Sequence, residues 1–421
     1  MLKTIELLPG ITLRCYFDTR FKQGCLSVQF IRPMCRQEAS YNALLPAVLL
    51  RGTANAPDLR DITLHLDDLY GASVGAVVRR IGDYQTTGFY ASFIDDKYAL
   101  EEDFVLSGVL DFLGDLLFRP RLEKGVFLQE YVESEKTNLI SAIESQLNNK
   151  QAYANANLLK LMCKEDSFGI PRLGEPEAVK EITAEGLYRH YQKLLQESPI
   201  ELFYVGSGDP EQIASMLKPM FSNLDRAPIS LSPQTAFHTS STDAREDIMD
   251  VSQGKLAMGF VTPITNRSSQ FAAMQLCNVI FGSGMTSKLF TQVREAMHLC
   301  YDISSGYHSA KGILIVSAGI DSRNKDLVCA EVQKQLALCA AGEISAQELT
   351  AAKQALFSGL QGIHDAPGSI ENYYATAALS GLNMTPEESQ KAIAQVTLEQ
   401  VSEAAKTLTC HCIYFLKGVQ E

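Results

Sequence analysis

Alternating apolar and polar positions near the N-terminus predict a short strand whose pattern recurs much later in the chain. Residues 23–33 read QGCLSVQFIRP, and residues 253–263 read QGKLAMGFVTP. In both stretches the apolar positions have a period of two, which is typical of a half-buried strand. They are Leu26, Val28 and Phe30 in the first stretch and Leu256, Met258 and Phe260 in the second. Each stretch has a glycine near its start and ends at a proline, which cannot donate to a strand ladder.

A predicted pair of strands follows in both copies of this pattern. Residues 70–95 read YGASVGAVVRRIGDYQTTGFYASFID, and residues 301–321 read YDISSGYHSAKGILIVSAGID. Both contain two apolar stretches around a glycine-bearing turn, and both end in Ile-Asp. Long helices are predicted as well, as in the first copy, where Leu139, Ile143 and Leu147 recur every four residues.

A third block closes each copy. Residues 174–206 and residues 384–418 both begin with a Pro-Glu pair, continue into a helix and end in an apolar strand. Thr183 and Thr397 stand where the N-cap of the helix is expected. Three blocks that recur in the same order indicate an internal duplication rather than two unrelated domains.

The segment between the two copies has a different composition. Residues 222–250 are rich in Ser, Thr, Pro and Asp and lack an apolar period, so we expect an interdomain linker there. The chain of 421 residues is also too long for one ordinary core. We therefore predict homologous domains at residues 1–221 and 251–421. Strand pairs separated by helices favour an α+β fold, with a largely antiparallel sheet and helices on one face in each domain.

Composition narrows the class of protein. The chain is 46% hydrophobic and 20% charged, as expected for a globular protein. No apolar run approaches a membrane span, and the start, MLKTIELLPG, lacks the features of a secretory signal. A net charge of −12 without a basic stripe argues against a nucleic-acid partner. Ten cysteines without a Cys-x-x-Cys pair favour reduced thiols. We expect a cytoplasmic protein without a membrane or nucleic-acid partner.

Common catalytic and metal-binding motifs are missing from the sequence. No two histidines are three or four residues apart, and none has a partner at a recognised metal spacing. A Gly-x-Ser-x-Gly nucleophile elbow is missing too. The stretch GSGMTS at residues 282–287 lacks the Lys-Ser/Thr of a phosphate loop, so a turn into a helix capped near Thr286 or Ser287 is the simpler interpretation.

The duplicated strand–helix–hairpin–helix unit resembles the halves of the M16 (insulinase/pitrilysin/processing-peptidase) family. The resemblance covers essentially the whole chain. Its sharpest local matches are LLRGTANAPDLRDITLHLDDLYGA at residues 49–72 and GSGMTSKLFTQVREAMHLCYDISSG at residues 282–306. The resemblance implies the family's metallopeptidase-like (LuxS/MPP-like) fold. It also implies that two chains of this length close around a chamber to form one peptidase.

The same resemblance implies where the family's zinc site would lie. Active relatives carry an H-x-x-E-H motif just before a Lys/Arg-Gly-Thr element, here residues 51–53, and a second helix adds a carboxylate ligand. The two histidines correspond to Ala43 and Ala47, and the general base corresponds to Pro46. The third ligand corresponds to Ala142. Methyl groups and proline cannot bind zinc or accept a proton. We therefore expect no metal, no cofactor and no catalysis by this chain alone.

Arg294 and Tyr301 match an Arg/Tyr pair that holds the substrate backbone in active relatives. A guanidinium offers several donors to carbonyl oxygens, and a phenol can donate to a developing oxyanion. The adjacent loop of Gly282, Ser283 and Gly284 would let a peptide backbone approach. The alternative is that Arg294 is a solvated helix residue and Tyr301 a half-buried residue at a strand start.

The chain resembles in particular a zinc-lacking, YmfF-like branch of the family. This implies a non-catalytic subunit that binds peptide together with a zinc-bearing M16 partner. The resemblance alone also implies a link, in some bacteria, to modification of elongation factor P. Two alternatives stay open: a structural subunit without a peptide role, and a self-dimerising peptide-binding protein.

Overall fold

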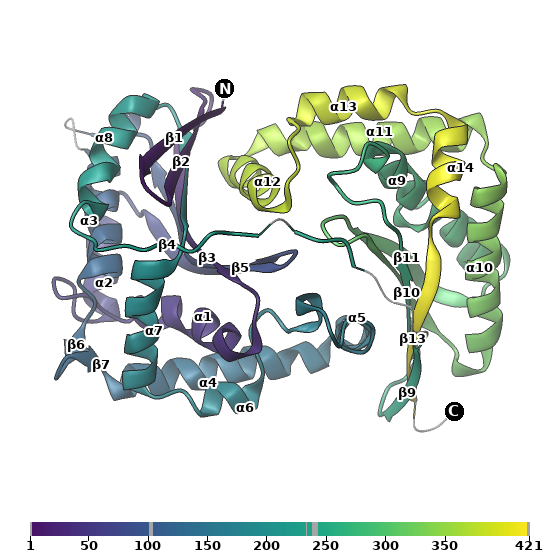
Figure 1. Ribbon diagram of the computed structural model, residues 1–421, viewed down its shortest axis with the longest axis horizontal. Helices are drawn as coiled ribbons and strands as arrows, with labels where there is room; N and C mark the ends of the chain where they lie inside the picture. Colours follow the sequence, from purple (N-terminus) through teal and green to yellow (C-terminus); the bar gives the residue numbers. More distant parts are fainter. Residues whose placement is uncertain (1, 101–103, 233, 238–242, 419–421) are drawn as a thin grey trace. The chain divides into compact units, whose positions relative to one another are not determined.

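The computed structural model describes residues 2–100, 104–232, 234–237 and 243–418, which form two compact units (Figure 1). Unit 1 comprises Met1–Glu144, Ile170–Ser232 and His364–Thr376, and unit 2 comprises Ser145–Gly169, Pro233–Ile363 and Ala377–Glu421. Each unit therefore contains one short segment from the opposite half of the sequence.

Unit 1 is built on a six-stranded sheet with the order β1-β2-β8-β3-β5-β4. Neighbouring strands are antiparallel except β2 and β8, which are parallel. The strands are β1 (Leu2–Leu8), β2 (Ile11–Phe17), β3 (Gln23–Pro33), β4 (Ser73–Ile81), β5 (Tyr84–Ile94) and β8 (Ile200–Gly206). A small separate hairpin consists of β6 (Leu122–Glu123) and β7 (Val126–Phe127).

Helices of the first half cover one face of this sheet. Leu44 of α1 and Leu113 of α3 share a buried core with Leu26 and Val28 of β3. The helices are α1 (Arg36–Leu49), α2 (Leu59–Asp68), α3 (Val105–Phe118), α4 (Gln129–Ser145), α6 (Pro176–Lys180), α7 (Ala184–Glu197) and α8 (Pro210–Phe221), with the 3-10 turn η1 (Asp96–Tyr98). The 3-10 turns η2 (Gln146–Asn148) and η3 (Ser167–Gly169) of the first half belong to unit 2.

The other face of the unit 1 sheet contacts the segment 364–376. This segment includes most of α12 (Pro367–Ser380) and comes from the second half of the chain. Tyr374 stacks on Phe203 of β8, with ring centroids 6.2 Å apart. Buried Glu371 accepts from the Ser27 hydroxyl (2.7 Å) and from both terminal nitrogens of Arg79 on β4 (2.9 and 2.8 Å). The segment is thus an integral part of unit 1.

Unit 2 repeats this sheet with one strand fewer among the described residues. Its order is β11-β12-β10-β13-β9, and β9 is parallel to β13. The strands are β9 (Asp243–Met249), β10 (Gly254–Val261), β11 (Cys300–His308), β12 (Ile313–Ile320) and β13 (Thr409–Gly418). This order matches β4-β5-β3-β8-β2 of unit 1, as the duplication requires. Strand β9 lies inside the predicted linker 222–250, which therefore contains regular structure.

The helices of unit 2 also divide between the two faces of the sheet. Leu256 and Met258 of β10 pack against α9 and α10, whereas Ala257 faces Leu158 and Met162 of α5, a helix from the first half (Figure 1). The helices are α5 (Lys150–Met162), α9 (Phe271–Asn278), α10 (Lys325–Ala341), α11 (Ala346–Gly362), α13 (Pro386–Gln395) and α14 (Leu398–Lys406), with the shorter turns η4 (Val279–Ser283), η5 (Leu289–Ala296), η6 (Ser322–Asn324) and η7 (Ile363–Asp365).

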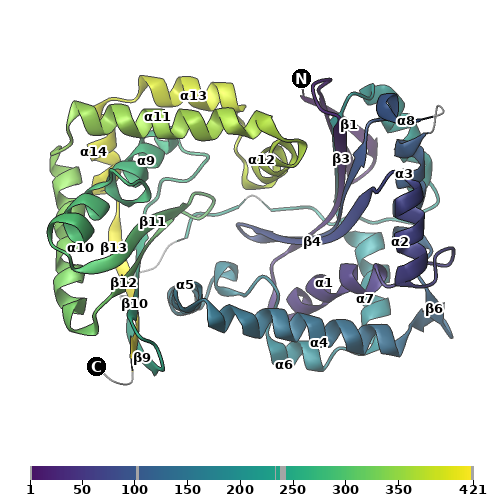
Figure 2. The ribbon, with the colours of Figure 1, turned by 180° about the vertical axis from the view of Figure 1, so that it is seen from behind.

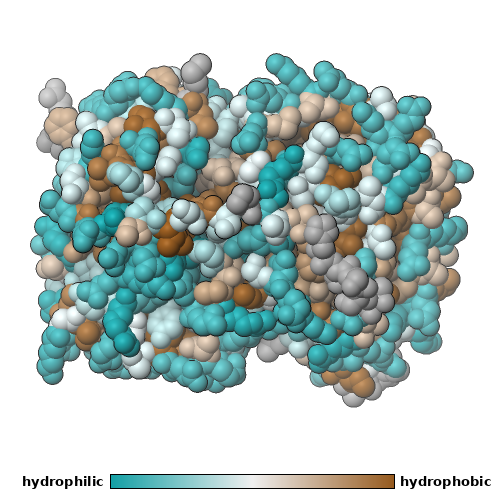
Figure 3. Space-filling model, viewed as in Figure 1, coloured by the Kyte–Doolittle hydropathy of each residue, from teal (hydrophilic) through white to brown (hydrophobic). Residues whose placement is uncertain are grey.

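The surface is mainly polar. On the face drawn in Figure 3, hydrophilic residues predominate and apolar residues form small separate patches. Among the residues that the structure describes, no helix combines the length and apolar character that a membrane span requires.

Candidate functional site

The predicted positions of the zinc ligands and of the general base lie on two helices of unit 1. Ala43, Pro46 and Ala47 are on α1, and Ala142 is on α4. Ala43 and Pro46 are buried, whereas Ala142 is exposed. In the described parts of the chain, no three His, Cys, Asp or Glu side chains are arranged to hold a metal ion. The residues present therefore do not fit a zinc ion.

Pro46 changes the hydrogen bonding of α1. A proline inside a helix has no N–H to donate to the carbonyl four residues earlier, which is that of Asn42. The hydroxyl of Thr87, on β5, donates to this carbonyl oxygen at 2.6 Å instead. Both residues are buried, at 2% exposure for Thr87 and 0% for Asn42. A side chain from the sheet thus replaces the bond that the helix lost.

Glu135, an acidic residue of α4 that lies seven residues before Ala142, pairs with Arg51 rather than facing an open site. Nη1 of Arg51 lies 3.3 Å from Oε1 of Glu135. The same guanidinium lies 5.2 Å from the ring centroid of Tyr131, also on α4. Arg51 therefore connects the end of α1 to α4 without a metal ion.

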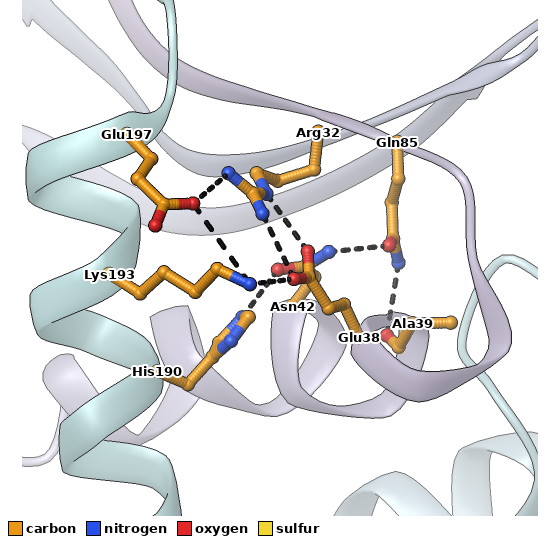
Figure 4. Close-up of polar contacts among 8 residues, drawn as sticks. All are labelled: Arg32, Glu38, Ala39, Asn42, Gln85, His190, Lys193 and Glu197. Carbon is orange, nitrogen blue, oxygen red and sulfur yellow. Dashed lines mark hydrogen bonds and ion pairs between the residues drawn. The ribbon is translucent and has the colours of Figure 1, made fainter. Parts of the chain in front are cut away.

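A partly buried ion cluster lies at the start of α1 (Figure 4). Arg32, near the end of β3, donates through Nε and Nη2 to both oxygens of Glu38, at 2.9 Å each. Its Nη1 lies 3.2 Å from Glu197, and Lys193 Nζ lies 2.7 Å from Glu38. Glu38 is on α1, whereas Lys193 and Glu197 are on α7. The cluster therefore joins β3, α1 and α7.

A chain of amides continues from the same place. Gln85 Nε2 donates to the carbonyl oxygens of Ala39 and Arg172, at 3.1 and 2.7 Å. Its Oε1 therefore faces Asn42 Nδ2, at 2.8 Å. Oδ1 of Asn42 then accepts from Nε2 of His190 at 2.7 Å, as Figure 4 shows. These partners assign the proton of the neutral imidazole to Nε2.

The charges in this region follow from burial and pairing. Burial tends to raise the pKa of Glu38, but hydrogen bonds from Arg32 and Lys193 outweigh it and hold the pKa at about 2. Burial lowers the pKa of His190 to about 4, against the favourable charge of Glu38. At neutral pH the carboxylate is therefore ionised and the imidazole is neutral.

Sequence reasoning missed this cluster, and the duplicated unit shows why. Arg32 precedes Pro33, and its counterpart Thr262 precedes Pro263. In unit 2, Thr262 makes a 2.6 Å hydroxyl–hydroxyl bond to Thr407 at the end of α14. The same elements are thus joined by ions in one unit and by two hydroxyls in the other. No sequence spacing signals the ionic version, because Lys193 lies 155 residues from Glu38 along the chain.

Tyr301 and Arg294 lie in unit 2. In β11, Cys300 pairs with Ile320 and Asp302 with Gly319, so Tyr301 is the extra residue of a β-bulge. Its side chain is 61% exposed, whereas that of Cys300 is buried. Strand β11 is an edge of the sheet (Figure 2). The bulge thus presents the phenol to solvent at the sheet edge.

Arg294 is on η5, which is a π-helix. Its guanidinium carbon lies 4.5 Å from the ring centroid of Phe290, and Nε lies 3.7 Å from the carboxylate of Glu295. The side chain is 39% exposed, so its donors can reach a ligand. The preceding segment η4 is also a π-helix. π-Helical turns are rare and often occur at functional sites.

The residues of the predicted glycine loop, at the end of η4 and directly after it, differ in burial. Gly282 is buried, and a Cβ there would lie 2.7 Å from Leu289 and from the Ser305 hydroxyl. Glycine is therefore required there for packing within unit 2. Ser283 is exposed and Gly284 half-exposed, so these two are the loop residues open to a ligand.

Comparisons with known proteins agree with this geometry. Residues 181–356 match the family model described as Peptidase M16 inactive domain. The probable inactive metalloprotease YmfF of Bacillus subtilis (strain 168) is 32% identical over 412 residues, covering 98% of this chain and 96% of that protein.

Solved structures give the same result. The crystal structure of a conserved protein from Enterococcus faecalis V583 has a TM-score of 0.92 at 28% identity, covering 100% of this chain and 99% of that one. The structure of a peptidase M16 inactive domain from Pseudomonas fluorescens has a TM-score of 0.81 at 17% identity, covering 99% and 98%.

The fold defines a class of protein: a two-unit α+β chain of metallopeptidase architecture, with alanine at the predicted zinc-ligand positions and proline at the predicted position of the general base. The chain belongs to the M16 peptidase family, in its YmfF-like branch. The α+β fold and the family resemblance expected from the sequence are thereby confirmed. The relative YmfF is itself described as a probable inactive metalloprotease.

Proposed function

We propose that this chain is the non-catalytic subunit of a heterodimeric, cytoplasmic M16 peptidase. A second M16 chain with an intact H-x-x-E-H motif supplies the zinc ion and the general base. The present chain completes the peptide-binding chamber and orients the peptide through Arg294 and Tyr301, with Ser283 and Gly284 beside them. A role in modification of elongation factor P is a prediction of the family resemblance alone.

The bulge at Tyr301 is the observation that carries this proposal. A tyrosine in a regular edge strand could pack its ring on the sheet, but this one is turned out and 61% exposed. On η5, which contacts β11, the planar guanidinium of Arg294 is oriented by the Phe290 ring while its donors remain accessible. Donors of these two kinds match the carbonyl oxygens of a peptide and the oxyanion that forms on attack.

The edges of the unit 2 sheet differ in a way that supports peptide binding at β11. At the opposite edge, β9 carries Asp243, Arg245, Glu246 and Asp247, and such charges discourage strand addition. Strand β11 contains Gly306 instead. A Cβ atom added to this glycine would have no other atom within 4 Å. An extended peptide could therefore pair with the backbone of β11 without a steric barrier.

The test is the Tyr301→Phe variant in a heterodimer reconstituted with an H-x-x-E-H chain from the same genome. The substrate is a library of quenched decapeptides with randomised central positions. Loss of one oxyanion donor costs about 2.7–4 kcal/mol, so we expect kcat to fall by roughly 10²–10³ at an unchanged melting temperature. Tyr98→Phe, which changes another exposed tyrosine, is the matched control.

The alternatives give different results in the same experiment. A structural subunit predicts that Tyr301→Phe leaves turnover unchanged, or lowers it only as folded complex is lost. A self-dimerising peptide-binding protein predicts a homodimer that binds library peptides without the second chain and cleaves none. Wild-type turnover by the Tyr301→Phe complex at equal stability would contradict the proposed role of the hydroxyl.

A further inference from the structure

The backbone between Arg294 and Tyr301 contains a strained residue, His298. Its φ angle is +53°, in the left-handed region that residues with a Cβ rarely adopt. His298 follows the end of the π-helix η5. The N–H of the next residue, Leu299, donates to the carbonyl of Val293 at 3.0 Å and so ends the helix. The chain then turns directly into β11.

Glycine is the usual residue at such a helix end. The helix α10 of the same unit ends in this way: Gly342 has a φ of +87°, and the N–H of Glu343 donates to the carbonyl of Leu338 at 3.0 Å. A glycine at position 298 would close η5 without the strain that a Cβ causes. The histidine is therefore not explained by the helix end itself.

The other two non-glycine residues with positive φ among the described residues have structural reasons. Lys124 (φ +52°) and Gly125 (φ +84°) form the two-residue turn of the β6–β7 hairpin, which requires positive φ at both positions. Tyr70 (φ +59°) uses its hydroxyl to bond both the N–H and the carbonyl of Leu100, at 2.9 and 3.1 Å.

His298 has no comparable structural reason. Its side chain is exposed. Within the described ranges, its ring makes no hydrogen bond, ion pair or aromatic contact. A strained residue whose side chain contributes nothing to the fold indicates a role for that side chain outside the fold.

We propose that His298 is a third peptide contact at the site of Arg294 and Tyr301. This inference rests on the proposed function and identifies a further residue that recognises the peptide backbone. Arg294 offers donors only, so it can bond to peptide carbonyl oxygens but not to peptide N–H groups. A neutral imidazole has one acceptor nitrogen and one donor nitrogen. The acceptor nitrogen of His298 takes the N–H of the same extended peptide.

The test compares His298→Gly with His298→Asn in the reconstituted heterodimer. The probe is the library decapeptide that the wild-type heterodimer cleaves fastest. Glycine relieves the strain and removes the ring, whereas asparagine tolerates positive φ and keeps a donor and an acceptor. Loss of one hydrogen bond corresponds to about a tenfold weaker affinity. We expect His298→Gly to raise KM about tenfold at an equal or higher melting temperature, and His298→Asn to recover part of the loss.

Each outcome of this experiment either supports or contradicts the inference about His298. An unchanged KM for His298→Gly overturns the inference, and so does a raised KM that accompanies a lower melting temperature in that variant. If Tyr301→Phe impairs turnover while His298→Gly does not, the proposed function survives and only this inference fails. If neither variant has an effect, or the wild-type heterodimer cleaves no library peptide, both fail.

Discussion

The bond from Thr87 to Asn42 should be essential for stability only because Pro46 is present. Pro46 leaves the Asn42 carbonyl without its helical partner, and the Thr87 hydroxyl takes that place at 2.6 Å. Replacing Thr87 by valine keeps the shape of the side chain and removes the donor. The carbonyl would then be buried without this hydrogen bond.

The size of the effect follows from burial. Asn42 and Thr87 are 0% and 2% exposed, so water cannot readily replace the lost donor. An unsatisfied buried polar group costs about 1–3 kcal/mol. We therefore expect Thr87→Val to lower the free energy of unfolding by about 1–3 kcal/mol.

A double-mutant cycle isolates the mechanism. Pro46→Ala restores an N–H that can donate to the Asn42 carbonyl, as in an ordinary helix turn. In this background Thr87→Val should cost less than about 0.5 kcal/mol, the range of a change without special partners. Unfolding in urea can be followed by circular dichroism and by tyrosine fluorescence, because the chain has no tryptophan. If the cost of Thr87→Val is the same with and without Pro46, the proposed compensation does not operate.

Two further predictions concern metal and pH. A triple variant that carries Ala43→His, Pro46→Glu and Ala47→His should not show zinc-dependent peptide hydrolysis, because Ala142 still occupies the predicted third-ligand position. Chelator-sensitive cleavage by this variant would show the Ala142 assignment to be incorrect. Between pH 6.5 and about 4, His190 is protonated to a smaller extent in the folded protein than in the unfolded chain. The free energy of unfolding should therefore fall by up to about 3 kcal/mol as the pH falls through this interval. Urea unfolding at several pH values should show a smaller fall for His190→Gln, and an identical pH profile would count against this role.

Local patterns in the sequence were enough to predict the repeated architecture. The period of two in residues 23–33 and 253–263 predicts β3 and β10, and both strands form, although they are buried on both faces rather than half-buried. Thr183 and Thr397 cap α7 and α14 through their side-chain oxygens. Such features depend on neighbours a few residues apart, so the sequence alone determines them.

The sequence also predicts which residues stand at the zinc-site positions, because the motif has a defined spacing on one helix. It could not show how α1 adjusts to Pro46, since the compensating hydroxyl of Thr87 comes from another element. The ion cluster around Glu38 was missed for the same reason: Lys193 reaches it from a helix 155 residues away along the chain.

Only the tertiary structure decided the remaining features. The charged stretch of β9 has no strand pattern, and it becomes a strand because its backbone pairs with β13. The segment 364–376 completes unit 1 because Glu371 finds Arg79 and Ser27 on the sheet. The bulge that exposes Tyr301 is set by its register with β12. These outcomes depend on pairing between distant residues, and a linear pattern carries no record of which distant groups will meet.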